Sequence, residues 1–180
     1  MALTAAQLQT WEEDGFLLLT GAIPRAEVGQ MGSILAHDAA FLGAVIQQTN
    51  AAGRKARQSW RAWELPEDDV YAAFCRHPAV GRRVEELLGD TVFHFHHKMI
   101  MKEAHTAGSW EWHHDYGYWH TSFLRSDLAS CLIAIEPSNR ANGCLEVMRG
   151  SHKAGRLEHG PVGQRDDQAG RPEACGVAHG

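Results

Sequence analysis

The spacing of apolar residues changes once along this chain, and that change most constrains the fold. Up to about Gly89 the apolar residues recur every three or four positions, as they do on amphipathic helices. From Val92 onward they alternate, and residues 92–102, 129–135 and 144–148 are predicted to be strands. Helices followed by antiparallel-type strands predict an α+β protein with a curved sheet or barrel.

Start and stop signals divide the first half of the chain into four predicted helices. Gly15 and Gly89 are expected to end the first and the last of them, and residues 16–19 are expected to form a short buried strand after the first. The helix beginnings are marked by a capping box and by three prolines: Thr4–Gln7, Pro24, Pro66 and Pro78.

Residues 49–64 show no clear period and are predicted to form a mobile loop. Asn50, Gly53 and the basic run 54–57 support that interpretation. The basic run is either a solvated surface or a site for an anionic substrate.

Composition narrows the class of protein. The chain has 180 residues, enough for one domain, and its net charge of -5 gives no basic field for nucleic acid or an anionic membrane. No apolar run reaches about 18 residues, and the N-terminus lacks the pattern of a secretory signal. Four cysteines without CxxC spacing are expected to be thiols, so a cytoplasmic protein is predicted. A homo-oligomer remains open.

The chain contains 12 histidines, and the segment 112–115 includes a pair of residues with the spacing of metal ligands. His113 and Asp115 are two residues apart, so on an extended segment their side chains point to the same face. An imidazole and a carboxylate supply two of the three ligands in the set of two histidines and one carboxylate that holds Fe(II).

Several segments of the chain form a recognisable series of motifs. They are the strand 96–102 with Trp112-His113-His114-Asp115, the aromatic run 116–120, and Asn142-Gly143-Cys144-Leu145 leading into Arg149-Gly150-Ser151-His152-Lys153. In this order and spacing they resemble the phytanoyl-CoA dioxygenase family, which includes the ectoine hydroxylases. The Asp14-Gly15-Phe16 sequence after the first helix also fits that family, and the resemblance covers roughly residues 4 to 155.

The resemblance implies N-terminal helices packed on a double-stranded β-helix, a jelly-roll or cupin-like barrel. It implies Fe(II) on His113 and Asp115, with 2-oxoglutarate and O2 as co-substrates. The implied reaction is hydroxylation of an unactivated C–H bond of a small organic substrate, coupled to decarboxylation of 2-oxoglutarate.

The same resemblance implies a later histidine ligand and an arginine that binds 2-oxoglutarate, and neither is identifiable here. His152 occupies the Gly-Ser-His turn instead. Residues 155–180 are expected to be a flexible loop or tail. We therefore expect a partial dioxygenase domain over residues 1–154 whose C-terminal strands are missing, as in a fragment. Four residues of the tail are unconvincing substitutes for the missing groups: His159, His179, Arg165 and Arg171.

Further candidates follow from the same resemblance. His96, Lys98 and Lys102 fall on a strand that faces the cofactor in the family, and either lysine is a candidate partner for a 2-oxoglutarate carboxylate. The alternative for each lysine is a surface position. Trp119 either walls the substrate pocket or packs in the core.

Two other functions remain open. His94 and His96 form an HxH pair on a predicted strand, as in cupin-type metalloenzymes. The missing third iron ligand also suits a catalytically inactive barrel that acts as a binding or scaffold protein.

Overall fold

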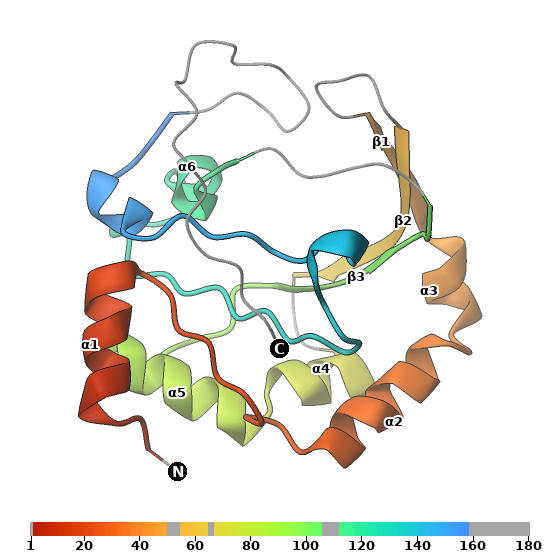
Figure 1. The fold of residues 1–180 in the computed structure, drawn as a ribbon, viewed down its shortest axis with the longest axis horizontal. Helices are drawn as coiled ribbons and strands as arrows, with labels where there is room; N and C mark the ends of the chain where they lie inside the picture. Colours follow the sequence, from red (N-terminus) through yellow and green to blue (C-terminus); the bar gives the residue numbers. More distant parts are fainter. Residues whose placement is uncertain (1, 50–54, 65–66, 106–111, 159–180) are drawn as a thin grey trace.

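The computed structural model describes residues 2–49, 55–64, 67–105 and 112–158 (Figure 1). None of the helices in these ranges is long and apolar enough to cross a membrane. The elements in chain order are α1 (Ala5–Asp14), α2 (Arg25–Leu35), α3 (Ala39–Gly43), β1 (Val45–Thr49), β2 (Lys55–Trp63), α4 (Val70–Cys75), α5 (Pro78–Leu88), β3 (His97–Lys102), α6 (Asp115–Trp119) and two 3-10 helices, Arg140–Asn142 and Ser151–Ala154.

The three strands form one antiparallel sheet in the order β1-β2-β3. β2 pairs with β1 from Val45 opposite Ser59, and with β3 from Trp63 opposite His97. The prediction of a loop over residues 49–64 is therefore wrong for the described part of that range. Hydrogen bonds to strands on both sides hold β2 in place, and these do not require an apolar period in the sequence.

The basic character of β2 is accommodated at the sheet surface. Arg57 Nε lies 3.3 Å from Glu103 Oε2, at the end of the neighbouring strand, and both side chains are about half exposed. Gln58 and Ser59, by contrast, are buried. Arg57 thus forms an ion pair with an acidic residue at the end of the neighbouring strand, and the predicted loop did not include this contact.

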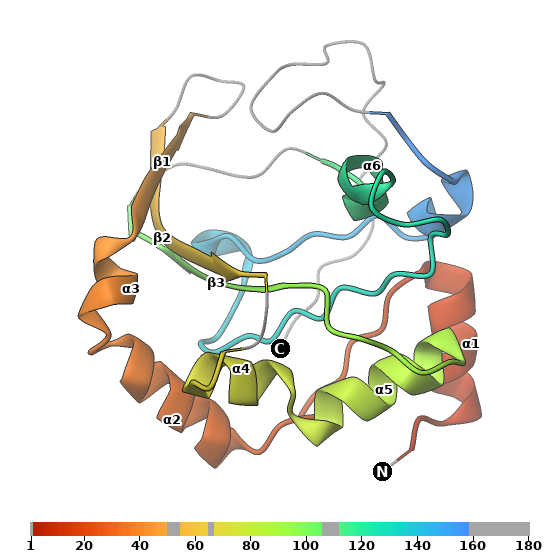
Figure 2. The same cartoon turned by 180° about the vertical axis from the view of Figure 1, so that it is seen from behind.

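The core lies between the helices and one face of the sheet (Figures 1 and 2). Met31 of α2, Trp63 of β2 and Tyr71 of α4 form a buried cluster. Trp63 is 4% exposed, and its ring centroid lies 4.9 Å from that of Tyr71. Partly buried apolar side chains pack against this cluster: Leu35, Phe74, Met99 and Ile135.

Most helix boundaries follow the local signals in the sequence. The capping box at the start of α1 is present, and Gly15 and Gly89 end α1 and α5 in the left-handed conformation. Helix α4 begins later than predicted, at Val70, because the carboxylate of Asp69 accepts a 2.7 Å hydrogen bond from the Ala72 amide. Residues 16–19 form no strand.

The α+β class is confirmed, whereas the predicted strands are only partly present. Of residues 92–102, only His97–Lys102 is a strand. Residues 129–135 are not assigned as a strand, and 144–148 contain a single bridge residue, Glu146, because a strand requires a hydrogen-bonded neighbour along its length. The sheet of the described residues has three strands and does not close into the implied barrel.

The Arg-Gly-Ser-His turn packs on the C-terminal end of α1, far away in sequence. Arg149 Nη1 lies 2.9 Å from Asp14 Oδ2, and the Gly150 amide donates a 2.7 Å hydrogen bond to the Asp14 carbonyl. His152 Nε2 lies 3.2 Å from the Glu12 carbonyl, to which it donates in the tautomer that carries its proton there. Two of the segments that carry the family resemblance therefore contact each other directly.

Replacing Gly15 with alanine is expected to lower the free energy of unfolding by at least about 2 kcal/mol. Gly15 has φ +80°, and a Cβ there would lie 2.1 Å from His152 Nδ1. Gly21→Ala is the matched control, because Gly21 also has a positive φ (+65°) but open space around it, and it is expected to cost about 1 kcal/mol. Urea denaturation measures both. Equal losses for the two variants would show that the contact with His152 is unimportant.

Candidate metal centre

His113 and Asp115 lie where an extended segment enters helix α6. His113 is non-helical, His114 is the extended N-cap residue, and Asp115 is the first helical residue. The pair is therefore not on a continuous strand, yet the two side chains converge. His113 Nε2 lies 3.5 Å from Asp115 Oδ1, and each side chain is about one-third exposed.

Asp115 has a defined partner on each carboxylate oxygen. Oδ1 faces His113, and Oδ2 accepts a 2.6 Å hydrogen bond from Ser130 Oγ. Burial by itself raises the pKa of Asp115, but hydrogen bonds from His113 and Ser130 outweigh it, with help from the positive charges of His113 and Lys98. The net pKa lies below the usual value of the group, so the carboxylate is ionised at neutral pH, as a metal ligand must be.

The geometry of the pair fits a shared metal ion. Two donor atoms that are each about 2.0–2.2 Å from one first-row divalent ion lie roughly 3.0–3.5 Å apart, and the observed separation falls at the upper end of that range. Among the described residues no further His, Cys, Asp or Glu forms a three-membered ligand group with this pair. The tail candidates lie outside the described residues: His159, His179, Arg165 and Arg171.

The three residues predicted to face the cofactor have different neighbours in the structure. The ring of His96 packs edge-on against Trp119 of α6, with centroids 4.8 Å apart, and burial lowers the pKa of that histidine. Lys98, on β3, contributes to the lowered pKa of Asp115. Lys102 donates a short hydrogen bond from Nζ to the Gly143 carbonyl, and so is engaged elsewhere.

The two histidines predicted for a cupin-type centre make different ring contacts. His94 Nε2 lies 3.1 Å from His97 Nδ1, whereas the His96 ring packs against Trp119. The prediction that His94 and His96 share one face of a strand does not apply, because strand β3 begins only at His97. The structure instead groups His94 and His97 with Cys75, which the sequence interpretation missed. The only signal was the three-residue spacing of the two histidines.

Removing the hydroxyl of Ser130 is expected to weaken metal binding at this centre. Ser130→Ala leaves Asp115 Oδ2 without its 2.6 Å hydrogen bond, so the carboxylate loses orientation and its pKa rises. We expect Fe(II) affinity to fall about 10- to 100-fold. Anaerobic titration with Fe(II) measures the change, and Ser122→Ala serves as a serine control. An unchanged affinity for Ser130→Ala would contradict this role.

Comparison with known proteins identifies the family of this chain. The sequence model of the family described as phytanoyl-CoA dioxygenase (PhyH) matches residues 11–174. L-proline trans-4-hydroxylase of Streptomyces griseoviridis is 37% identical over 93 residues, which are 51% of this chain and 35% of that protein. Ectoine dioxygenase of Streptomyces avermitilis is 28% identical over 156 residues, which are 84% of this chain and 52% of that protein.

A human relative extends the same similarity. The peroxisomal phytanoyl-CoA dioxygenase of Homo sapiens is 25% identical over 170 residues, which are 87% of this chain and 50% of that protein. The chain thus spans about half the length, or less, of these relatives. The family model covers most of the sequence, including the segment with His113 and Asp115. The family predicted from the sequence motifs is confirmed, and the chain belongs to the phytanoyl-CoA dioxygenase family.

Proposed function

We propose that this chain carries the iron-binding pair of an Fe(II)- and 2-oxoglutarate-dependent dioxygenase that hydroxylates a small organic substrate. The observation that carries the proposal is the 3.5 Å approach of His113 Nε2 and Asp115 Oδ1. Membership of a family whose relatives are named as dioxygenases and hydroxylases supports the reaction class. The substrates named for those relatives belong to them and do not identify the substrate of this chain.

The residues of the centre have distinct roles in this proposal. His113 and Asp115 hold Fe(II), which together with 2-oxoglutarate and O2 supplies the chemistry that hydroxylates a C–H bond. Ser130 keeps Asp115 oriented through its hydrogen bond. The ring of Tyr118 lies beside that of His113, with centroids 5.5 Å apart and planes tilted by 54°.

One positively charged side chain and two aromatic rings are proposed to complete the centre. Lys98 is the cation proposed to meet a carboxylate of 2-oxoglutarate, because its charge already acts on Asp115. His96 and Trp119, which pack together, are proposed to wall the substrate side. We propose that the third iron ligand is a histidine outside the described residues.

A second candidate is a binding protein without turnover. The observation that favours it is the lack of a third His, Cys, Asp or Glu beside His113 and Asp115 in the described part of the chain. Two ligands leave a divalent ion weakly held, since such catalytic centres use three protein ligands.

Anaerobic addition of Fe(II) and 2-oxoglutarate tests the proposal. A dioxygenase centre is expected to give a visible charge-transfer band, and admission of O2 is expected to yield succinate. Fe(II) binding with no band and no succinate would favour the binding protein. Absence of saturable Fe(II) binding would overturn the iron assignment itself.

A further inference from the structure

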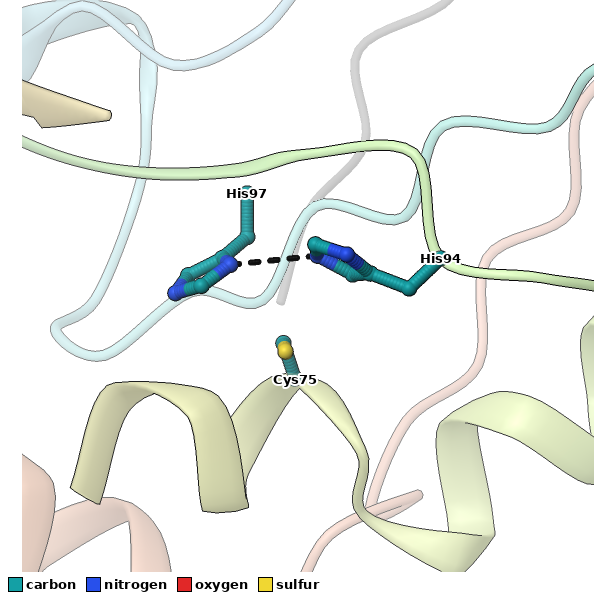
Figure 3. A group of neighbouring side chains, drawn as sticks. All are labelled: Cys75, His94 and His97. Carbon is teal, nitrogen blue, oxygen red and sulfur yellow. Dashed lines mark hydrogen bonds between the residues drawn. The ribbon is translucent and has the colours of Figure 1, made fainter. Parts of the chain in front are cut away.

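A second group of metal-ligand side chains lies away from the His113–Asp115 pair. Cys75 is the last residue of α4, and His97 is the first residue of β3. His94 lies three residues before His97 (Figure 3). One potential ligand atom from each residue lies within 4.8 Å of those of the other two. Helix α4 brings them together because it packs through Tyr71 against Trp63, the residue paired with His97 across the sheet.

The two imidazoles are held firmly in this arrangement. The ring of His97 stacks on Trp63 with centroids 4.9 Å apart and planes 3° apart. His94 meets His97 edge-on, with Nε2 of the first 3.1 Å from Nδ1 of the second. The remaining nitrogens, His94 Nδ1 and His97 Nε2, are buried without a hydrogen-bond partner. These two nitrogens would carry the ring N–H groups when His94 Nε2 and His97 Nδ1 bind a metal ion.

We propose that Cys75 Sγ, His94 Nε2 and His97 Nδ1 form a binding site for a zinc-like divalent cation. One thiolate and two imidazoles are a donor set that suits Zn²⁺ and disfavours Mg²⁺ and Ca²⁺, which take oxygen ligands. The fourth position of a tetrahedral ion is left for water or another ligand. Figure 3 shows the Cys75 side chain rising from the helix toward the gap between the two rings.

The distances require only small side-chain movements. In a tetrahedral zinc site the two nitrogens lie about 3.4 Å apart and each lies about 3.6 Å from the sulfur. The nitrogens here are 3.1 Å apart, and all three donors lie within 4.8 Å. The Cys75 thiol is free, and its Sγ lies 3.2 Å from the Ala72 carbonyl one turn earlier, to which it donates. Rotation of Cys75 away from that carbonyl closes the site.

Protonation states are consistent with binding. Burial lowers the pKa of His94 and of His97, so both imidazoles are neutral at pH 7 and have lone pairs to offer. Burial raises the pKa of the Cys75 thiol, which argues against a free nucleophilic thiolate. Binding of Zn²⁺ therefore breaks the S–H bond, forms a Zn–S bond and releases one proton to solvent.

Cobalt titration of the purified, metal-free chain tests the site. Co²⁺ is expected to bind with a sulfur-to-cobalt charge-transfer band, and added Zn²⁺ is expected to bleach it. Cys75→Ser is expected to remove the band and to weaken binding at least about 10-fold. Cys144→Ser and His113→Ala are matched controls that are expected to keep the band, because neither residue belongs to the cluster.

Alkylation of the unmodified chain gives a test that does not depend on variants folding. Zn²⁺ is expected to slow iodoacetamide labelling of Cys75 and to leave Cys144 unchanged. Equal labelling rates of Cys75 with and without Zn²⁺ would overturn the proposal. A cobalt band that survives Cys75→Ser would also overturn it. A cobalt band in the unmodified chain, with no succinate formed from Fe(II), 2-oxoglutarate and O2, would support this site while the proposed dioxygenase function fails.

Discussion

Replacing Asp115 with asparagine is expected to lower the affinity for Fe(II) at least about 100-fold and to abolish succinate formation. Loss of a group that merely orients a ligand typically costs 10- to 100-fold, and loss of the ligand itself costs more. Asparagine keeps the shape of the side chain but removes the charge that the lowered pKa of Asp115 maintains at neutral pH. Anaerobic Fe(II) titration and a succinate assay measure the two effects.

Two further variants isolate the cause of that loss. Asp115→Glu keeps the charge but moves the carboxylate away from Ser130 Oγ, so we expect an intermediate affinity. His37→Gln changes a histidine whose Nδ1 bonds to the Ser33 carbonyl, outside the centre, and is expected to bind Fe(II) like the parent chain. Unchanged Fe(II) affinity in Asp115→Asn would remove the basis for assigning iron to this pair.

Truncating Trp63 to alanine is expected to lower the free energy of unfolding by about 3–5 kcal/mol, the largest stability effect in the described core. Trp63 is 4% exposed and contacts the rings of Tyr71 and His97. The guanidinium of Arg61 lies 4.6 Å from its ring centre and adds a cation–π contact. The cavity would lie between the helices and the sheet, so both layers lose contacts. Urea denaturation followed by circular dichroism measures the change.

Trp112→Ala is the control for the loss of a tryptophan as such. Trp112 is 48% exposed, so its truncation removes much less buried surface and is expected to cost less than about 1.5 kcal/mol. Trp63→Phe, which retains an aromatic ring, is expected to fall between the two alanine variants. Similar losses for Trp63→Ala and Trp112→Ala would contradict the placement of Trp63 at the centre of the core.

Two sets of contacts join segments that lie far apart in the sequence. Asp14 accepts bonds from Arg149 and from the Gly150 amide, and Gly15 leaves room for His152. Ser130, from a segment predicted as a strand, meets Asp115. The first set of contacts holds helix α1 against the turn at residues 149–152. The second orients Asp115, a proposed iron ligand.

The sequence alone was sufficient for features that depend on neighbours in the chain. The capping box and Gly15 define α1, and Pro78 and Gly89 bound α5, because caps act within one turn of helix. His113 and Asp115 were found for the same reason: one residue separates them, so their convergence needs little tertiary structure. The change of apolar period gave the α+β class.

Only the tertiary structure decided features that join distant segments. Strand β2 carries an irregular, basic sequence and exists because β1 and β3 supply its hydrogen bonds from both sides. The predicted strand at 129–135 has no such neighbour in the described residues and remains unassigned. Cys75 joins His94 and His97 only through the packing of α4 against the sheet. Backbone pairing and side-chain packing between segments far apart depend on the whole fold, and no local pattern specifies them.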